Sequence, residues 1–419
     1  MRLLLLLSAA LICKAASPGP STSDLDTIYP GIEALYINIH SNPELGFEEK
    51  QTAVKLAGRL KALGYDVTEG VGGTGVVGLL RNGAGPVAML RTELDALPVT
   101  EQTGLPFASK TAGVMHACGH DLHMAAWTGT AQWMAEHRQQ WHGTLMLVGQ
   151  PAEELGAGAA AMLKDGLFVR FPKPDFAVGL HDDDTLPAGV IGYHAGFFRA
   201  AFDAVNVTIF GRGGHGAMPQ NTVDPVVIAA RTILTWQTIV SRENDPRSPV
   251  VITVGSIHGG TKSNIIPDQV QLQLSVRTFD AEVRKRVLEA IARVAKGEAA
   301  ASGAPREPLV ERTSGGEAVY NDPELTSRLA VALTKGMGQG SAVEMPAKMT
   351  SEDFAEYGRA GVKAVLLHIG AVDALKLAES QRTGIPVPAP HSPQWAPVRE
   401  PTLKAAVQAE TIALLDLLN

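Results

Sequence analysis

Apolar residues along the chain follow two spacings that alternate. They recur at helical spacing over residues 32–39, 52–63 and 122–136, with a further helical stretch near 159–164. Between these segments lie short, nearly continuous apolar runs, which are typical of buried strands, at 75–80, 86–90, 144–148 and 176–180. Because strands that alternate with helices form parallel sheets, the pattern predicts an α/β body with a mostly parallel central sheet.

The pattern changes after Phe198. Strands are predicted over 204–210, 250–257 and 270–279, and amphipathic helices over 225–241 and 281–301. Two helices set among three or four strands predict a small α+β domain, a ferredoxin-like sandwich. The α/β pattern resumes near Pro308 and ends in a helix over 403–418. We therefore expect one body, 31–197 and 308–419, interrupted by an inserted domain, 198–307.

The N-terminus has the features of a secretory signal peptide over residues 1–16. Arg2 precedes the apolar run 3–11, and small residues lie before a cleavage point after Ala15. The run is far shorter than the roughly 20 apolar residues that span a bilayer. An apolar N-terminal helix packed on the body is the alternative. We expect export to the periplasm or the medium, with residues 17–30 as a linker and no membrane span.

Composition narrows the function classes. The chain has 419 residues, 45% of them hydrophobic, and a net charge of −7 without any basic stripe, so a nucleic-acid partner is not expected. Its two cysteines are Cys13 and Cys118. A lipid anchor on Cys13 is a weaker alternative, because Ile12 precedes it. Cleavage after Ala15 would leave Cys118 alone, so no internal disulfide is expected.

Residues 116–123, His-Ala-Cys-Gly-His-Asp-Leu-His, form the densest group of polar side chains. Three imidazoles, a thiol and a carboxylate within eight residues indicate a metal site. The alternative is a capped helix start with Asp121 at the N-cap, but capping requires neither Cys118 nor His120.

Further polar side chains follow predicted strands. Glu153 and Glu154 come soon after the strand 144–148, and active sites of open α/β sheets lie at such strand ends. One acid could bind metal while the other moves a proton, although alone such a pair is more often a solvated loop. The candidate ligands are Cys118, His120, Glu154, His181 and His391. A catalytic zinc takes about three protein ligands, so five favour two metals.

The inserted domain carries candidates of its own. Glycines on both sides of His215 would let its loop approach a ligand closely. Asn264 is a polar residue directly before an apolar segment. Arg277 lies in a predicted strand, where its side chain either binds a substrate carboxylate or points to solvent. Residues 73–78 match G-x-G-x-x-G but run on into a strand, so hydride chemistry is not expected.

These segments together resemble the metal-dependent amidohydrolases that include hippurate hydrolases, bacterial N-acyl-amino-acid amidohydrolases and plant auxin-conjugate hydrolases. The matching segments, in chain order, are 40–47, 116–123, 151–154, 213–219, 263–268 and 391–393. The resemblance implies a two-metal exopeptidase-like catalytic domain, an inserted lid and dimerisation domain, and a homodimer or larger homo-oligomer.

The resemblance also assigns roles. Glu153 would be the general base, His215 would reach the scissile carbonyl across a dimer contact, and Asn264 and Arg277 would hold the substrate carboxylate. The five ligands named above would hold two divalent ions. A thiolate favours zinc, with manganese or cobalt as alternatives. Three acids are expected to support the ligands from behind: Glu93, Asp95 and Asp121.

The expected reaction is hydrolysis of an N-acyl or N-aroyl amino acid, hippurate-like, to a carboxylic acid and a free amino acid. Aroyl-phenylalanine amides of the ochratoxin type belong to the same class. The alternatives are a metallo-dipeptidase or carboxypeptidase on small peptides and, from another class, a non-catalytic exported binding protein. Such a binding protein would be expected to have lost Glu153 or a ligand, and none is lost.

The chain departs from the family pattern in two places. Glu93 stands where the family usually has aspartate, and Thr350-Ser351 replaces two glycines before Glu-Asp-Phe. The segment 182–184 is also unusually acidic. We expect Thr350 and Ser351 to reshape the pocket wall near His391, which affects substrate range and leaves the ligands intact.

Overall fold

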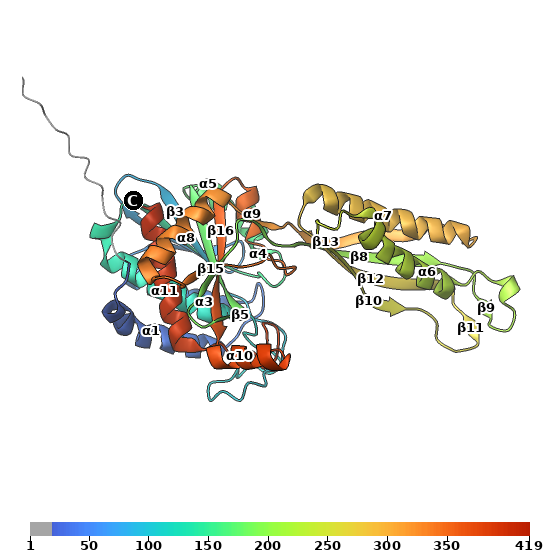
Figure 1. Cartoon of the computed structure of the whole chain (residues 1–419), viewed down its shortest axis with the longest axis horizontal. Coiled ribbons are helices and arrows are strands. Elements are labelled where there is room, and N and C mark those ends of the chain that lie inside the picture. The colour runs from blue at the N-terminus through green and yellow to red at the C-terminus, as the bar shows by residue number, and fades with distance from the viewer. Residues whose placement is uncertain (1–18) are drawn as a thin grey trace, which may run out of the picture.

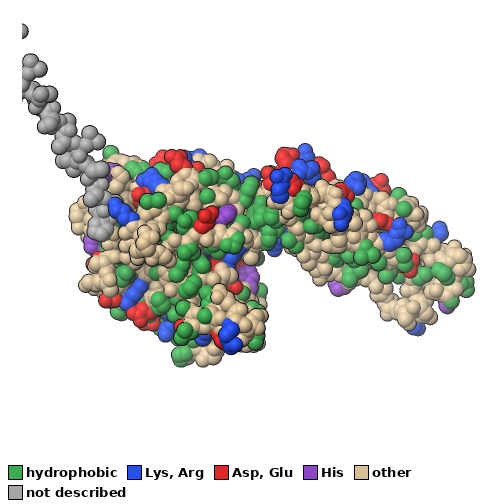
Figure 2. Space-filling model, in the orientation of Figure 1, with side chains coloured by type: hydrophobic (Ala, Val, Ile, Leu, Met, Phe, Trp, Pro, Cys, Tyr) green, Lys and Arg blue, Asp and Glu red, His purple; other side chains and the backbone are tan. Residues whose placement is uncertain are grey.

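The computed structural model describes residues 19–419 and shows an elongated molecule, with a globular body from which a smaller domain projects (Figure 1). A narrow waist separates the two parts in the space-filling view (Figure 2). The signal peptide expected over 1–16 lies outside the described residues. Within 19–419, no helix combines the length and the apolar character needed to cross a membrane.

A mixed eight-stranded sheet forms the centre of the body. Its middle strands β4, β3, β5 and β16 are parallel neighbours, while antiparallel pairs occur nearer the edges. In spatial order the strands are β1 (Asp66–Val71), β2 (Gly75–Asn82), β4 (Gly143–Gln150), β3 (Val87–Glu93), β5 (Phe176–Pro187), β16 (Lys363–Val372), β6 (Ile191–Tyr193) and β15 (Ala342–Glu344). The predicted α/β fold with a mostly parallel sheet is confirmed.

Helices cover both faces of this sheet. The larger core lies under α1 (Thr22–His40), α2 (Lys50–Ala62), α3 (His120–Glu136), α8 (Pro323–Met337) and α11 (Arg399–Leu417). The opposite face is covered by α4 (Gly158–Lys164), α5 (Leu167–Arg170) and α9 (Ala355–Arg359), and α10 (Ala374–Thr383) follows β16. Helix α1 begins after a capping box at Ser21 and buries Leu25 and Ile28, so the linker expected over 17–30 is wrong from residue 22 onward.

The projecting domain is an antiparallel sheet with two helices on one face, as expected for an α+β sandwich (Figure 1). The sheet order is β10 (Val250–His258), β12 (Gln269–Thr278), β8 (Ala201–Phe210) and β13 (Leu309–Gly316), and the helices are α6 (Pro225–Thr238) and α7 (Ala281–Ala301). Because β13 pairs with β8, the inserted domain extends past the predicted boundary at residue 307. Strand β13 was not predicted, because its residues are largely exposed and polar and leave no apolar pattern in the sequence.

Short strands complete the inserted domain and its connection to the body. At the waist, β7 (Gly196–Arg199) pairs with β14 (Val319–Asn321), so the two crossing chain segments are hydrogen-bonded to each other. At the far end, β9 (Gly214–His215) pairs with β11 (Ile265–Ile266).

The core of the inserted domain can be tested at Ile291, which α7 buries fully against the sheet. We expect Ile291→Ala to lower the free energy of unfolding by about 2–5 kcal/mol, because it removes apolar contacts and leaves a cavity. The measurement is urea denaturation. Lys285→Ala, exposed on the same helix, is the control and should change stability little.

Candidate metal centre

The candidate ligands come from one edge of the central sheet. Strands β3, β4 and β5 are parallel, so their carboxyl ends lie at the same edge. Glu93 at the end of β3 is in register with Gln150 at the end of β4, and the loop after β4 carries Glu153 and Glu154. His181 lies in β5 beside them. Helix α3 starts at this edge with His120, and the loop before α11 adds His391.

The five predicted ligands form two overlapping groups. The ligand atoms of Cys118, His120 and His181 all lie within 4.8 Å of one another, and so do those of Cys118, Glu154 and His391. Cys118 Sγ is 3.5 Å from His181 Nε2, and His391 Nε2 is 3.4 Å from a Glu154 oxygen. Two groups that share Cys118 fit two neighbouring cations.

Hydrogen bonds made by the Nδ1 atoms of two histidines orient their Nε2 atoms toward the site. His120 Nδ1 donates to the Asp95 carbonyl at 2.8 Å, and His181 Nδ1 donates to the Asp182 carbonyl at 2.8 Å. The Nε2 atoms therefore face the site, as in histidines that bind metal. His120 Nε2 and Glu154 Oε1 are buried and have no hydrogen-bond partner among residues 19–419. Since buried polar atoms are normally paired, these two fit metal ligands.

Glu153 is placed to handle a proton. One of its oxygens lies 3.8 Å from His120 Nε2. Burial raises the pKa of Glu153 well above its ordinary value, and the nearby carboxylates of Glu352 and Glu154 raise it further. A carboxylate with a raised pKa is suited to take up a proton and return it near neutral pH.

Four of the five candidate ligands, all except His120, line a cavity of about 740 Å³ at the waist, between the body and the inserted domain. Arg277 of β12 lies in its wall, half-buried, and donates to Ser351 Oγ at 2.6 Å. Arg277 therefore faces the cavity rather than bulk solvent. Ser351 and Thr350, the residues that replace the family glycines, both line the cavity, as expected.

The structure does not bring His215 and Asn264 to this cavity within one chain. His215 in β9 pairs with Ile265, and Gly216 N–H donates to the Asn264 carbonyl at 2.9 Å. Both side chains are exposed. They lie at the end of the inserted domain that is farthest from the body (Figure 1).

The three acids expected behind the ligands differ in position. Asp95 supports His120 directly and also accepts the Glu154 backbone N–H at 2.9 Å. The Glu93 carboxylate accepts a hydrogen bond from His123 Nδ1 at 3.0 Å, and His123 is not one of the five candidate ligands. Asp121 contacts His40 Nδ1 at 2.6 Å. Asp121 is not the N-cap of α3, because Gly119 occupies that position.

Arg91 was missed by the sequence analysis, although its segment was recognised. Its side chain is fully buried and donates to Glu352 at 2.8 Å, to Asp353 at 3.0 Å and to Gln150 at 2.9 Å, and it also contacts Glu93. An arginine inside an apolar strand with acidic segments elsewhere in the chain was the available clue. Arg91 holds the loop ends that surround the cavity.

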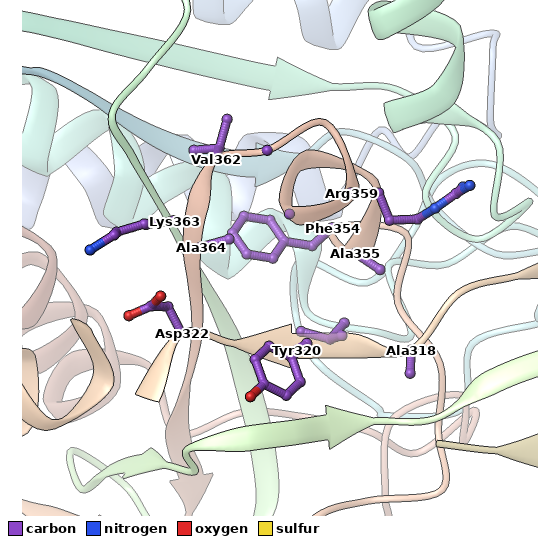
Figure 3. Close-up of a pocket in the computed structure, with 12 residues that line it drawn as sticks. Ala318, Tyr320, Asp322, Phe354, Ala355, Arg359, Val362, Lys363 and Ala364 are labelled. Carbon is purple, nitrogen blue, oxygen red and sulfur yellow. The ribbon is translucent and has the colours of Figure 1, made fainter. Parts of the chain in front are cut away.

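A second hollow of about 360 Å³ lies on the outer side of the segment that contains Phe354 (Figure 3). The Phe354 ring occupies its middle, and the Arg359 and Lys363 side chains extend away from that ring. None of the predicted ligands lines it. Of these two hollows, the larger one is the one that candidate ligands line.

The α/β body, the inserted domain and the two groups of candidate ligands together have the arrangement of a metal-dependent hydrolase. Comparison with known proteins agrees. Residues 89–382 match Peptidase family M20/M25/M40, and the chain belongs to this family of hydrolases.

Its relatives include enzymes of two kinds. The chain is 38% identical to the hippurate hydrolase of Campylobacter jejuni over 77% of this chain and 79% of the relative. It is 36% identical to thermostable carboxypeptidase 2 of Saccharolobus solfataricus over 80% of this chain and 84% of the relative. A solved structure from Bacillus subtilis, described as a dinuclear metal-binding peptidase of the M20 family, superimposes with a TM-score of 0.78 at 29% identity, covering 94% of this chain and 99% of that one.

Gly119 offers a test of the ligand geometry. Its φ is +75°, and a Cβ there would lie 2.2 Å from a carboxylate oxygen of Asp182, next to His181. We expect Gly119→Ala to weaken metal binding at least tenfold and to lower stability. Metal affinity is measured by competition with a chelator.

The matched control is Gly113→Ala. Gly113 also has a positive φ, +74°, but open space where a Cβ would go. It should show only the backbone cost of roughly 1–2 kcal/mol, with normal metal affinity. Equal metal affinity in both variants would contradict the importance of the close contact between Gly119 and Asp182.

Proposed function

We propose that this protein hydrolyses N-acyl or N-aroyl amino acids to a carboxylic acid and a free amino acid. The observation that supports this most strongly is that Arg277 lines the same cavity as Cys118, Glu154, His181 and His391. A guanidinium group binds a carboxylate through paired N–H donors, so a substrate with a terminal carboxylate can place its amide at the ligands. Similarity to a hippurate hydrolase adds support, because hippurate is such an amide.

The residues divide the chemistry between them. When bound, two divalent ions, with zinc favoured by the thiolate and manganese or cobalt as alternatives, would lower the pKa of a water molecule and polarise the amide carbonyl. Cys118, His120, Glu154, His181 and His391 would hold these ions. Glu153 takes the proton from the attacking water and returns it to the leaving nitrogen. Arg277 holds the carboxylate of the amino acid.

We further propose that a second copy of the chain completes the site. His215 and Asn264 are exposed at the end of the inserted domain and cannot act on their own cavity in this conformation. Met218 and Ile265 beside them are 48% and 50% exposed, an apolar surface that another subunit would cover. In a homodimer or larger assembly, His215 and Asn264 would act on the scissile carbonyl of the partner's site.

A carboxypeptidase acting on small peptides is the second candidate, supported by similarity to a thermostable carboxypeptidase. The discriminating measurement is cleavage of N-benzoylglycine, whose acyl group has no α-amine. Cleavage supports the amidohydrolase, and activity confined to peptides supports the carboxypeptidase. Amides of the ochratoxin type are also substrates under the first proposal.

We also propose that the protein is exported, because residues 1–16 have the features of a secretory signal peptide.

Substitution of Glu153 tests the general base. We expect Glu153→Gln to keep its metal and to lose about 100- to 10,000-fold in kcat, because the amide cannot accept the proton. Metal content by mass spectrometry and turnover of N-benzoylglycine are the measurements. Glu154→Gln is the matched comparison and should lose metal as well as activity. Near-normal turnover by Glu153→Gln would refute the assignment.

Mixing two inactive variants tests the shared site. Glu153→Gln and His215→Ala subunits, unfolded together and refolded, should form mixed dimers that contain one complete site each. Random pairing then restores about a quarter of wild-type activity if His215 acts across the dimer. No recovery, with mixed dimers demonstrated by native mass spectrometry, would mean that His215 acts within its own chain.

A further inference from the structure

Arg199 is a buried cation without an anionic partner. It is the last residue of β7, at the waist, and only 6% of its surface is exposed. Its Nε and Nη2 donate to His368 Nε2 at 3.2 and 3.0 Å, and its Nη1 donates to Thr350 Oγ1 at 3.0 Å. Within residues 19–419, no carboxylate lies within 4.0 Å of its guanidinium group. Burying a charge without a counter-charge costs free energy, so a ligand that supplies the counter-charge is expected.

His368 does not supply the missing negative charge. Its Nε2 accepts from Arg199, so the ring proton is on Nδ1, which donates to Asp183 at 2.6 Å. The ring is therefore neutral and stands between Arg199 and Asp183. Asp183 itself is paired directly with Lys348, 2.5 Å away.

Arg277, which is half-buried, also lines this cavity without a carboxylate partner in the described residues. Its one side-chain hydrogen bond within the described residues goes to Ser351, and its guanidinium lies over the Phe202 ring. A guanidinium group has five N–H donors, so Arg199 keeps two unused and Arg277 keeps four. Both arginines line the cavity that contains the ligand groups.

The other acids of the cavity already have partners or roles. Glu153 and Glu154 are assigned to the metal site, Asp353 is bonded to Arg91, and Asp182 accepts from Trp395 at 2.9 Å. Glu352 is bonded to Arg91 through one oxygen, and its other oxygen is buried without a hydrogen-bond partner in the described residues; the Arg199 charge helps to lower the Glu352 pKa, but no ion pair within 4.0 Å joins the two. Lys348, the third cation that lines the cavity, is held by Asp183 and Asp184. Arg199 and Arg277 are thus the two cavity cations left for a ligand.

Thr350 and Ser351 connect the two arginines. They are consecutive residues, and each accepts a hydrogen bond from one guanidinium group. Because both arginines line the same cavity, a substrate that places its scissile amide at the candidate metal ligands and one carboxylate on Arg277 can bring its amino-acid part to Arg199. A second negative group on the acyl part would lie on the other side of the scissile bond.

From this arrangement we infer that the site selects N-acyl derivatives of dicarboxylic amino acids of the aspartate or glutamate type. Arg277 binds one carboxylate and Arg199 binds the other. The inference rests on the proposed function and narrows its substrate class. It also gives a role to Thr350 and Ser351, which stand where the family usually has glycines: they orient the two cations.

Binding measurements test the inference without relying on turnover. The zinc-loaded Glu153→Gln protein is titrated calorimetrically with N-benzoyl-glutamate and N-benzoyl-glutamine, and with the aspartate and asparagine pair. The members of each pair differ in one charge at nearly equal size. We expect at least one acid to bind about 10- to 100-fold more tightly than its amide.

Substitution of Arg199 assigns the preference to a residue. Arg199→Gln, added to the Glu153→Gln protein, should reduce the acid-over-amide ratio to about one, and Arg199→Lys should keep part of it. Lys348→Gln, a cavity cation with its own carboxylate partners, is the matched control and should keep the ratio. Melting temperatures show whether each variant is folded.

Two results would overturn the inference: equal affinity for acids and amides, or an unchanged acid-over-amide ratio in Arg199→Gln. An unchanged ratio with an equal loss of affinity for both ligands would mean that both arginines hold the same carboxylate. Turnover by the wild-type protein separates this inference from the proposed function. Cleavage of all benzoyl amino acids without an acid preference would overturn the substrate class alone. A binding preference with no cleavage of any of them would support the two-cation site and contradict the amidohydrolase.

Discussion

The buried Arg91 guanidinium and the carboxylates around it are the interaction on which the site depends. Arg91 lies in β3 and is bonded to Gln150 at the end of β4 and to Glu352 and Asp353 from a distant part of the chain. Breaking a buried ion pair by removing one partner costs roughly 3–5 kcal/mol, since the remaining charge has no counter-charge. These contacts therefore hold the loop after β4, which carries Glu153 and Glu154, against the segment that forms the cavity wall.

The same principle, that a buried polar group requires a partner, explains the rest of the centre. Asp95 and the Asp182 carbonyl occupy the back of His120 and His181, which leaves the Nε2 atoms facing the cavity. His120 Nε2 and Glu154 Oε1 are the buried atoms left without partners at the point where cations would bind. Arg199, which lines the same cavity, is a cation with no carboxylate in direct contact among residues 19–419. Bound metal ions would pair with His120 Nε2 and Glu154 Oε1, and an acidic substrate would pair with Arg199.

Much of the fold could be predicted from the sequence because burial imposes a readable spacing. The middle strands and the helix that starts at His120 followed from apolar runs and spacing. The five candidate ligands were predicted from the cluster over 116–123, from Glu154 and His181 after predicted strands, and from His391. Strand β13 was missed, since its exposed polar residues leave no apolar pattern. The helix over residues 22–30 was missed because Ser, Asp and Pro in that stretch resemble a linker, although Ser21 caps it.

Other features depend on contacts between distant segments, which no local pattern records. Arg91 and Glu352 are 261 positions apart, and Arg199 and His368 are 169 apart. The sequence showed that Thr350 and Ser351 depart from the family pattern, but not that they accept hydrogen bonds from two arginines. The position of His215, far from its own cavity, likewise required the structure, because it depends on the length and direction of the inserted domain (Figure 1).

Cys118 lies in both groups of candidate ligands and would be shared by two neighbouring cations. The most direct test is the metal content of the purified protein by native mass spectrometry, for the wild type and for His181→Ala and His391→Ala. The structure predicts two ions per chain in the wild type and one in each variant, because each substitution removes a ligand from one of the two groups that share Cys118. A wild-type chain that binds a single ion, or none, at saturating zinc would contradict the account.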